Sequence, residues 1–99
     1  MVVRRVPADQ RVTVATFRNR SSADMSLYLE MLAEEVVMSP GHAVELLACP
    51  TDGLLPITID WVEGGLQIHP HHEFDPEWHV RFRGKVIRAG HPTILSEHE

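Results

Sequence analysis

Apolar and polar residues alternate along much of this 99-residue chain, and this period of two predicts β-strands. The strands expected outside the hairpin described below are Arg11–Arg18, His42–Cys49, Glu77–Arg83 and Lys85–Ala89. In the third of these, Trp78, Val80 and Phe82 would share an apolar face that packs in the core. Gly84 would mark a bulge or bend before the fourth, which continues in the same direction.

The segment that follows the first strand predicts an amphipathic helix. Ser21 and Asp24 have the spacing of a capping box, with aspartate in the position where glutamate or glutamine is usual. Apolar residues recur at helical spacing at Met25, Tyr28, Leu29, Leu32 and Val36. Because a residue that precedes proline avoids helical angles, Pro40 would end the element. We therefore expect a helix at Ser22–Met38.

A hairpin is expected at residues 56–70, where two alternating segments flank the Gly-Gly pair at positions 64 and 65. A two-residue turn at this pair would place Trp61 opposite Ile68 and Asp60 opposite His69. Trp61 and Ile68, together with Ile59, would then point toward the helix and pack in the core.

These elements predict an α+β fold in the order β-α-β-β-β-β, with a single helix packed on one face of a mainly antiparallel sheet of about five strands. The length fits one domain over residues 1–99, with a flexible arm at 1–10 and a flexible tail at 91–99. Cys49 is the only cysteine, which excludes an intrachain disulfide and favours a cytoplasmic protein. No apolar run approaches the roughly 20 residues of a membrane span, and we expect no membrane association.

The net charge of −5 is unevenly distributed along the chain. Residues 1–20 contain five arginines and one acid, whereas residues 21–80 contain eleven acids and neither lysine nor arginine. Residues 81–99 contain four basic residues and two acids. Such an acidic segment produces a field that affects partners and association rates. Alternatively, the basic outer segments neutralise the acidic middle within the domain.

The sequence contains neither a nucleophile with a spaced base nor a phosphate-binding loop, so we expect neither enzymatic activity nor a cofactor. The acidic middle favours a small protein-binding module of the inhibitor, immunity or regulatory type. Its partner would be a basic protein, for example one that handles nucleic acid. On the expected helix, the partner-binding residues would be Glu30 and Glu34 together with the apolar Leu27 and Met31. A homodimer is also compatible with this interpretation.

A second hypothesis is a metal site in the histidine-rich segment 69–79. Its expected ligands are Asp60, His69, His71 and His79, a set that zinc or another first-row divalent ion accepts. The His-x-His pattern with a following acid resembles the first cupin motif. Its spacing differs at both ends and the chain has no room for the second motif, so no family is assigned. The competing interpretation is that this segment is a solvated turn, in which the histidines contact water and bind no metal.

A third hypothesis is nucleic-acid binding through the basic residues near the end of the chain. Arg81, Arg83, Lys85 and Arg88 have the charge needed to follow a phosphate backbone. The neighbouring aromatic residues, however, are expected on the core face, where they cannot stack on bases. The negative net charge also opposes this function.

Overall fold

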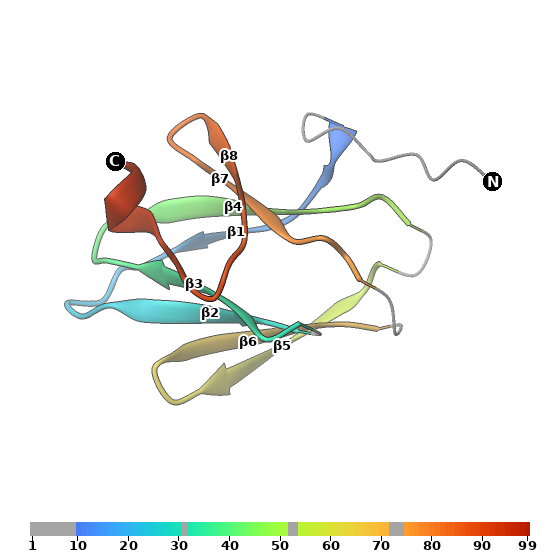
Figure 1. Ribbon diagram of the computed structural model, residues 1–99. Coiled ribbons are helices and arrows are strands. Elements are labelled where there is room, and N and C mark those ends of the chain that lie inside the picture. Colours follow the sequence, from blue (N-terminus) through green and yellow to red (C-terminus); the bar gives the residue numbers. More distant parts are fainter. Residues whose placement is uncertain (1–9, 31, 52–53, 72–74) are drawn as a thin grey trace.

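The protein is a sandwich of two β-sheets (Figure 1). The computed structural model describes residues 10–30, 32–51, 54–71 and 75–99. These residues form nine strands and a short 3-10 helix, η2: β1 Val12–Arg18, β2 Met25–Leu29, β3 Glu34–Met38, β4 Ala43–Ala48, β5 Ile57–Val62, β6 Gly65–Pro70, β7 His79–Phe82, β8 Lys85–Arg88, β9 Thr93–Ile94 and η2 Leu95–His98.

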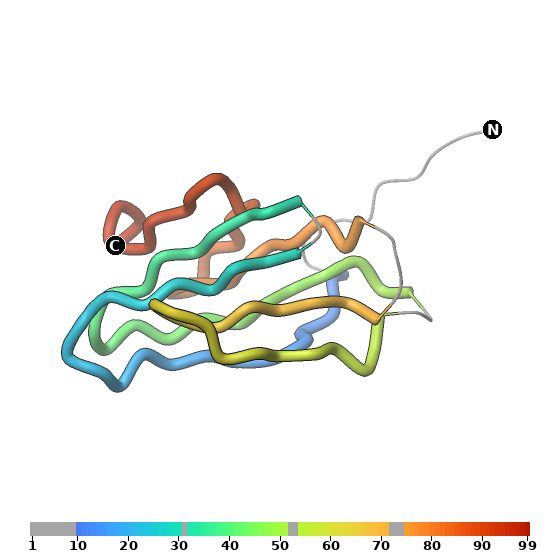
Figure 2. Tube along the Cα trace, turned by 90° about the horizontal axis from the view of Figure 1, so that it is seen from below, coloured from blue at the N-terminus to red at the C-terminus, as the bar shows by residue number. Residues whose placement is uncertain are grey.

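One sheet has four strands in the order β1-β4-β7-β8, and the other has five in the order β5-β6-β2-β3-β9. Neighbouring strands are antiparallel except in the pairs β2–β6 and β3–β9. The edge strands β1 and β5 lie on the same side of the sandwich, whereas β8, β9 and η2 lie on the opposite side (Figure 2).

The core lies between the two sheets and receives apolar side chains from both. Its largest fully buried apolar side chains are Trp78, Phe82, Leu27, Leu29, Met38, Leu46, Ile68, Leu95, Val36 and Val80. The predicted apolar face of residues 77–83 is therefore confirmed, and so are the strands predicted at Arg11–Arg18 and His42–Cys49. Burial of these side chains is the main favourable contribution to folding.

The predicted α+β fold is wrong, because no long helix exists in the described residues and the expected helix Ser22–Met38 is the β2–β3 hairpin. The apolar residues of this segment fit both periods. Met25, Leu27 and Leu29 alternate with polar or half-buried positions, and Val36 and Val37 favour strands. Pairing with β6 on the other side of β2 favours the extended conformation.

The residues that resemble a capping box instead form the turn between β1 and β2. The buried Asn19 side chain donates to the carbonyl oxygens of Ala23 and Met38, each at 2.9 Å. The hydroxyl group of Ser21 donates to the carbonyl oxygen of Ala23 at 2.8 Å. Serine and asparagine side chains satisfy backbone groups in turns as readily as at helix ends, so the signal was ambiguous.

The predicted hairpin at residues 56–70 exists as β5 and β6, but its register differs by two positions. Val62 pairs with Gly65, so the turn residues are Glu63 and Gly64, and Trp61 lies opposite Leu66. Gly65 instead allows a close approach of β6 to β2: a Cβ atom there would lie 1.8 Å from the carbonyl oxygen of Ser26.

The end of the chain contains a second hairpin and a packed segment. Arg83 and Gly84, with φ angles of 52° and 79°, form the two-residue turn between β7 and β8, so Gly84 is not a bend within one strand. The expected tail at 91–99 contains β9 and η2, and Leu95 is fully buried. Most of the expected arm at 1–10 lies outside the described residues.

Candidate functional site

The core-facing side of the five-stranded sheet is left uncovered at β5. Directly opposed residues of neighbouring strands share a face, and Val36, Leu27, Leu66 and Trp61 form one such row from β3 to β5. Val36 and Leu27 are fully buried and Leu66 is half-buried, but Trp61 is 88% exposed. The four-stranded sheet therefore covers the middle of this face and leaves its β5 end open to solvent.

The neighbouring row follows the same gradient. From β3 to β5 it contains Glu34, Leu29, Ile68 and Ile59. The first three are buried, whereas Ile59 is 43% exposed. Ile59 and Trp61 thus lie at the end of two apolar rows, and an exposed apolar surface of this kind is typical of interaction sites.

An apolar hollow lies near the start of β5, where Leu55 precedes the strand. It has a volume of about 410 Å³ and is lined by Val12, Thr13, Val14, Pro50, Thr51, Leu54 and Leu55. Leu55 is 59% exposed and Val12 is 37% exposed. Because β1 and β5 lie on the same side of the sandwich (Figure 2), the hollow adds apolar surface to that side.

The other face of the β5–β6 hairpin is polar and acidic. Asp60 and His69 are close, with 3.8 Å between Oδ2 and Nε2, and the Thr58 hydroxyl lies 3.3 Å from Nε2 of His71. Asp60, like Glu63 in the turn, is exposed. This face therefore presents carboxylates beside the exposed apolar residues of β5.

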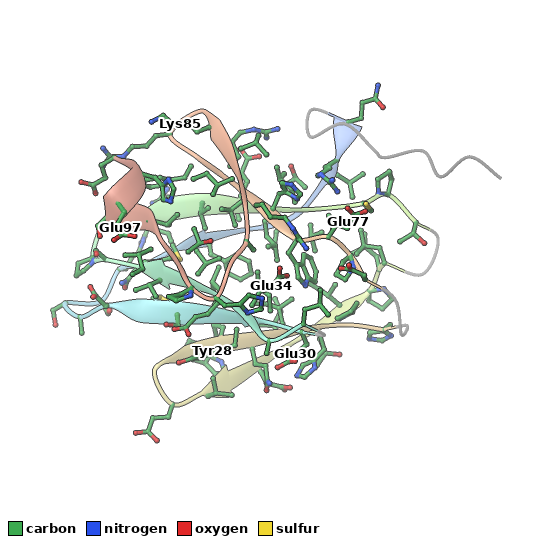
Figure 3. All side chains as sticks on the ribbon, viewed as in Figure 1. Tyr28, Glu30, Glu34, Glu77, Lys85 and Glu97 are labelled. Carbon is green, nitrogen blue, oxygen red and sulfur yellow. The ribbon has the colours of Figure 1, made fainter. Side chains whose placement is uncertain are left out.

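A pocket of about 370 Å³ continues this acidic face across β6 and β2. Its lining residues are Tyr28, Glu30, Ala33, Glu34, Val62, Glu63 and Gln67. Gln67 Nε2 donates to the Glu30 carboxylate at 2.7 Å. Trp78 Nε1 donates to the Glu30 backbone carbonyl at 2.6 Å. Glu30 therefore has a fixed position in the pocket that the exposed Glu63 also lines, and Figure 3 shows it near Tyr28.

Glu34 borders this pocket, but its side chain belongs to the core side of the sheet. It alternates with the half-buried Glu35 and shares a row with Leu29, and Figure 3 places it in the middle of the molecule. Its side chain is 3% exposed, with Oε2 3.4 Å from Arg88 Nη2, and Oε1 has no hydrogen-bond partner among the described residues. Burial raises the pKa of Glu34 above its ordinary value, although nearby Arg88 and His91 oppose this effect.

The two sheets carry opposite charge. The strands of the five-stranded sheet contain three acidic residues and neither lysine nor arginine. The strands of the four-stranded sheet contain four basic residues, namely Arg18, Arg81, Lys85 and Arg88, against the single acid Glu45. The uneven distribution of charge along the sequence therefore corresponds to a difference in charge between the two sheets.

The four residues expected to bind a partner do not form a common surface. Leu27 lies in the core and Glu34 is buried, which corrects their expected exposure on a helix. Glu30 remains at the acidic pocket, and Met31 lies outside the described residues. The sequence interpretation placed Trp61 and Ile59 in the core, because alternation identifies a face and not the extent of its cover.

The expected metal ligands are only partly brought together. Asp60 and His69 are neighbours, and His71 contacts Thr58. His79 lies on β7 in the other sheet, where its Nδ1 is 2.7 Å from the carbonyl oxygen of Glu77, and burial lowers its pKa. Across residues 10–30, 32–51, 54–71 and 75–99, no group of three or more potential ligands is arranged to hold a metal ion.

Three of the four basic residues expected to contact phosphate make contacts within the domain. Arg81 Nη1 lies 2.6 Å from Glu45 Oε2, and Arg88 donates to the carbonyl oxygen of Trp78 at 2.9 Å. The guanidinium group of Arg83 lies 5.2 Å from the ring centre of Phe82. Lys85 is exposed. Trp78 and Phe82 are buried and offer no base-stacking surface.

Cys49 forms a small polar cluster with Arg11 and Glu77. Arg11 Nη1 donates to the sulfur atom at 3.0 Å, and the thiol donates to Glu77 Oε2, also at 3.0 Å. Burial and the hydrogen bond to Glu77 raise the pKa of Cys49. The thiol form is therefore favoured over the reactive thiolate.

Comparison with known proteins leaves the family open. No protein-family model, no curated protein and no solved structure matches this chain. Within the described residues, no helix has the length and apolar character required to cross a membrane.

Proposed function

We propose that this protein is a small protein-binding module of the inhibitor, immunity or regulatory type. It docks a basic protein partner on the β5–β6 hairpin. The observation that carries the proposal is the 88% exposure of Trp61 at the uncovered end of an otherwise buried apolar row. Tryptophan is enriched among the residues that dominate binding energy, and an exposed tryptophan beside Ile59 provides a large apolar contact.

The charge around Trp61 supports a basic partner. Asp60 and Glu63 are exposed on the hairpin, and Glu30 adds a third carboxylate at the adjacent pocket. No strand of the five-stranded sheet contributes a lysine or arginine. A surface with one sign of charge favours partners of the opposite sign and accelerates their encounter.

Site-specific photocrosslinking in the cells that produce the protein tests this proposal. A photoreactive phenylalanine analogue is placed at position 61, and the matched control carries it at Val86, which is 36% exposed on β8. We expect the analogue at position 61 to crosslink a basic protein. The analogue at position 86 should not crosslink that protein. With that partner purified, Trp61→Ala should weaken binding by at least roughly tenfold, whereas Val86→Ala should have little effect.

Two results would contradict the proposal. In the first, both positions capture the same proteins, which would indicate nonspecific contact. In the second, the protein captured at position 61 is acidic, or binds Trp61→Ala as tightly as the wild type.

A further inference from the structure

The edge strands of the sandwich differ in how they are protected from pairing with another chain. β1, β8, β9 and β5 are at the edges of the two described sheets. β1 contains Arg18 and β8 contains Lys85 and Arg88, and basic residues on an edge strand oppose its pairing with other strands. β9 has only two residues. β5 has six residues, none of them basic, and among the described residues it pairs only with β6.

The side chains of β5 form two different surfaces. Ile57, Ile59 and Trp61 share the core-facing side, on which Ile59 and Trp61 are exposed. Thr58 and Asp60 share the opposite, acidic side. A strand placed beside β5 would therefore meet apolar side chains on one of its faces and a carboxylate on the other.

From these features we infer that the partner binds by strand addition: an extended segment in which apolar and basic residues alternate joins the five-stranded sheet beside β5. This inference rests on the proposed function and specifies the conformation and sequence pattern of the partner. Main-chain hydrogen bonds to β5 supply affinity that does not depend on sequence. The apolar residues of the segment cover Ile59 and Trp61, and its basic residues lie on the side of Asp60.

Charge argues against a second copy of this chain as the added strand. Two β5 strands paired with each other would bring together two copies of Asp60 and Glu63 with no lysine or arginine in either strand or in β6. Like charges that face each other across strands are destabilising. A basic segment of another protein removes this repulsion and gains attraction from the same carboxylates.

A peptide titration followed by NMR of nitrogen-15-labelled protein tests strand addition. The probe is a capped peptide in which valine and lysine alternate over about six residues, the length of β5. Two further peptides carry backbone N-methyl groups, one on every valine and the other on every lysine. In a strand at a sheet edge, only alternate N–H groups face the neighbouring strand. We expect one methylated peptide to lose at least roughly tenfold in affinity and the other to bind within about threefold of the parent.

The titration also locates the probe. Shifts should concentrate in β5 and β6, and Trp61→Ala should weaken binding, whereas Val86→Ala should not. A peptide of alternating valine and glutamate should not bind. Loss of affinity in both methylated peptides, or in neither, would overturn strand addition. So would shifts centred on β8, an absence of shifts, or β5 shifts on dilution without peptide, which would identify a second copy as the occupant.

The proposed function is tested independently by the crosslinks at position 61. If the peptide titration fails while those crosslinks capture a basic protein, strand addition is wrong and the docking function stands. If the crosslinks fail as well, the docking function is also wrong.

Discussion

Glu34 of β3 and Arg88 of β8 meet across the two sheets, with 3.4 Å between Glu34 Oε2 and Arg88 Nη2. The carboxylate is almost fully buried, and in the part of the chain that the structure describes its second oxygen, Oε1, has no hydrogen-bond partner. Separating a buried ion pair by removing one partner costs about 3–5 kcal/mol in other proteins. Glu34 comes from the acidic middle of the sequence and Arg88 from its basic end. Their contact is what the hypothesis of charge neutralisation within the domain predicts for this pair.

The first prediction concerns the pH dependence of stability. Burial raises the pKa of Glu34 above its ordinary value of 4.5. The folded state therefore favours the protonated Glu34 carboxyl. The stability gained from this protonation is fully present below pH 4.5 and is lost as the pH rises through the raised pKa. Relative to Glu34→Gln, the wild type should lose free energy of unfolding as the pH rises above 4.5, measured by urea unfolding at several pH values.

The exposed Glu97 supplies the control for this experiment. Glu97→Gln should follow the wild-type profile, because it removes a solvated carboxylate. Parallel pH profiles for the wild type and Glu34→Gln would show that Glu34 has the same pKa in the folded and unfolded states.

Much of the strand content could be predicted from the sequence, but its arrangement could not. Alternation identified β1, β4 and β7, and it placed the β5–β6 hairpin correctly but with a register wrong by two positions. The segment from Met25 to Met38 satisfies both the helical and the strand period, and only its parallel pairing with β6, nearly 40 residues away, decides between them. Local pattern contains no information on such long-range pairing.

The exposure of the candidate site could not be predicted from the sequence for a related reason. Trp61 and Ile59 have the alternation of core residues and lie on the core side of their sheet. Their exposure depends on how far the opposite sheet extends, which is a property of the whole sandwich. The charge pattern could be predicted more directly, because four of the five strands of one sheet come from the segment that contains neither lysine nor arginine.

The second prediction contrasts the two tryptophans. Trp78 is fully buried and donates a hydrogen bond to the carbonyl oxygen of Glu30, so Trp78→Ala should lower the free energy of unfolding by about 3–5 kcal/mol. Trp61→Ala should change it by no more than about 0.5 kcal/mol, as is usual for surface substitutions. Urea unfolding followed by circular dichroism measures both. Similar losses in the two variants would place Trp61 in the core.

The third prediction tests the close packing of β6 on β2. A Cβ at Gly65 would collide with the carbonyl oxygen of Ser26, so Gly65→Ala should cost at least about 1–3 kcal/mol as the strands separate. Gly41 provides the comparison: its φ of 87° strains an alanine there, a cost that Gly65 lacks, but a Cβ atom at Gly41 would have no atom within 4 Å. A Gly65→Ala variant that is as stable as Gly41→Ala would exclude the parallel β2–β6 pairing.

The fourth prediction separates a buried acid from an exposed one. Glu34→Lys places a cation in the core, next to the half-exposed Arg88, and should cost at least about 3 kcal/mol. Glu63→Lys changes an exposed turn residue and should leave the free energy of unfolding within about 0.5 kcal/mol of the wild type. Equal stability of the two variants in thermal or urea unfolding would contradict the assignment of Glu34 to the core side.

The central claim is that the acidic β5–β6 hairpin recognises basic segments. Its most direct test is the affinity of the valine–lysine peptide across a salt series for three proteins: the wild type, the Asp60→Lys/Glu63→Lys double variant and the control Glu97→Lys. Charge attraction between exposed groups is screened over about 10 Å at 0.1 M salt. The wild type and the control should bind most tightly at low salt and lose affinity as salt rises. The double variant should bind weakly throughout, with little dependence on salt. Equal affinity and equal salt dependence in the wild type and the double variant would contradict recognition through this face.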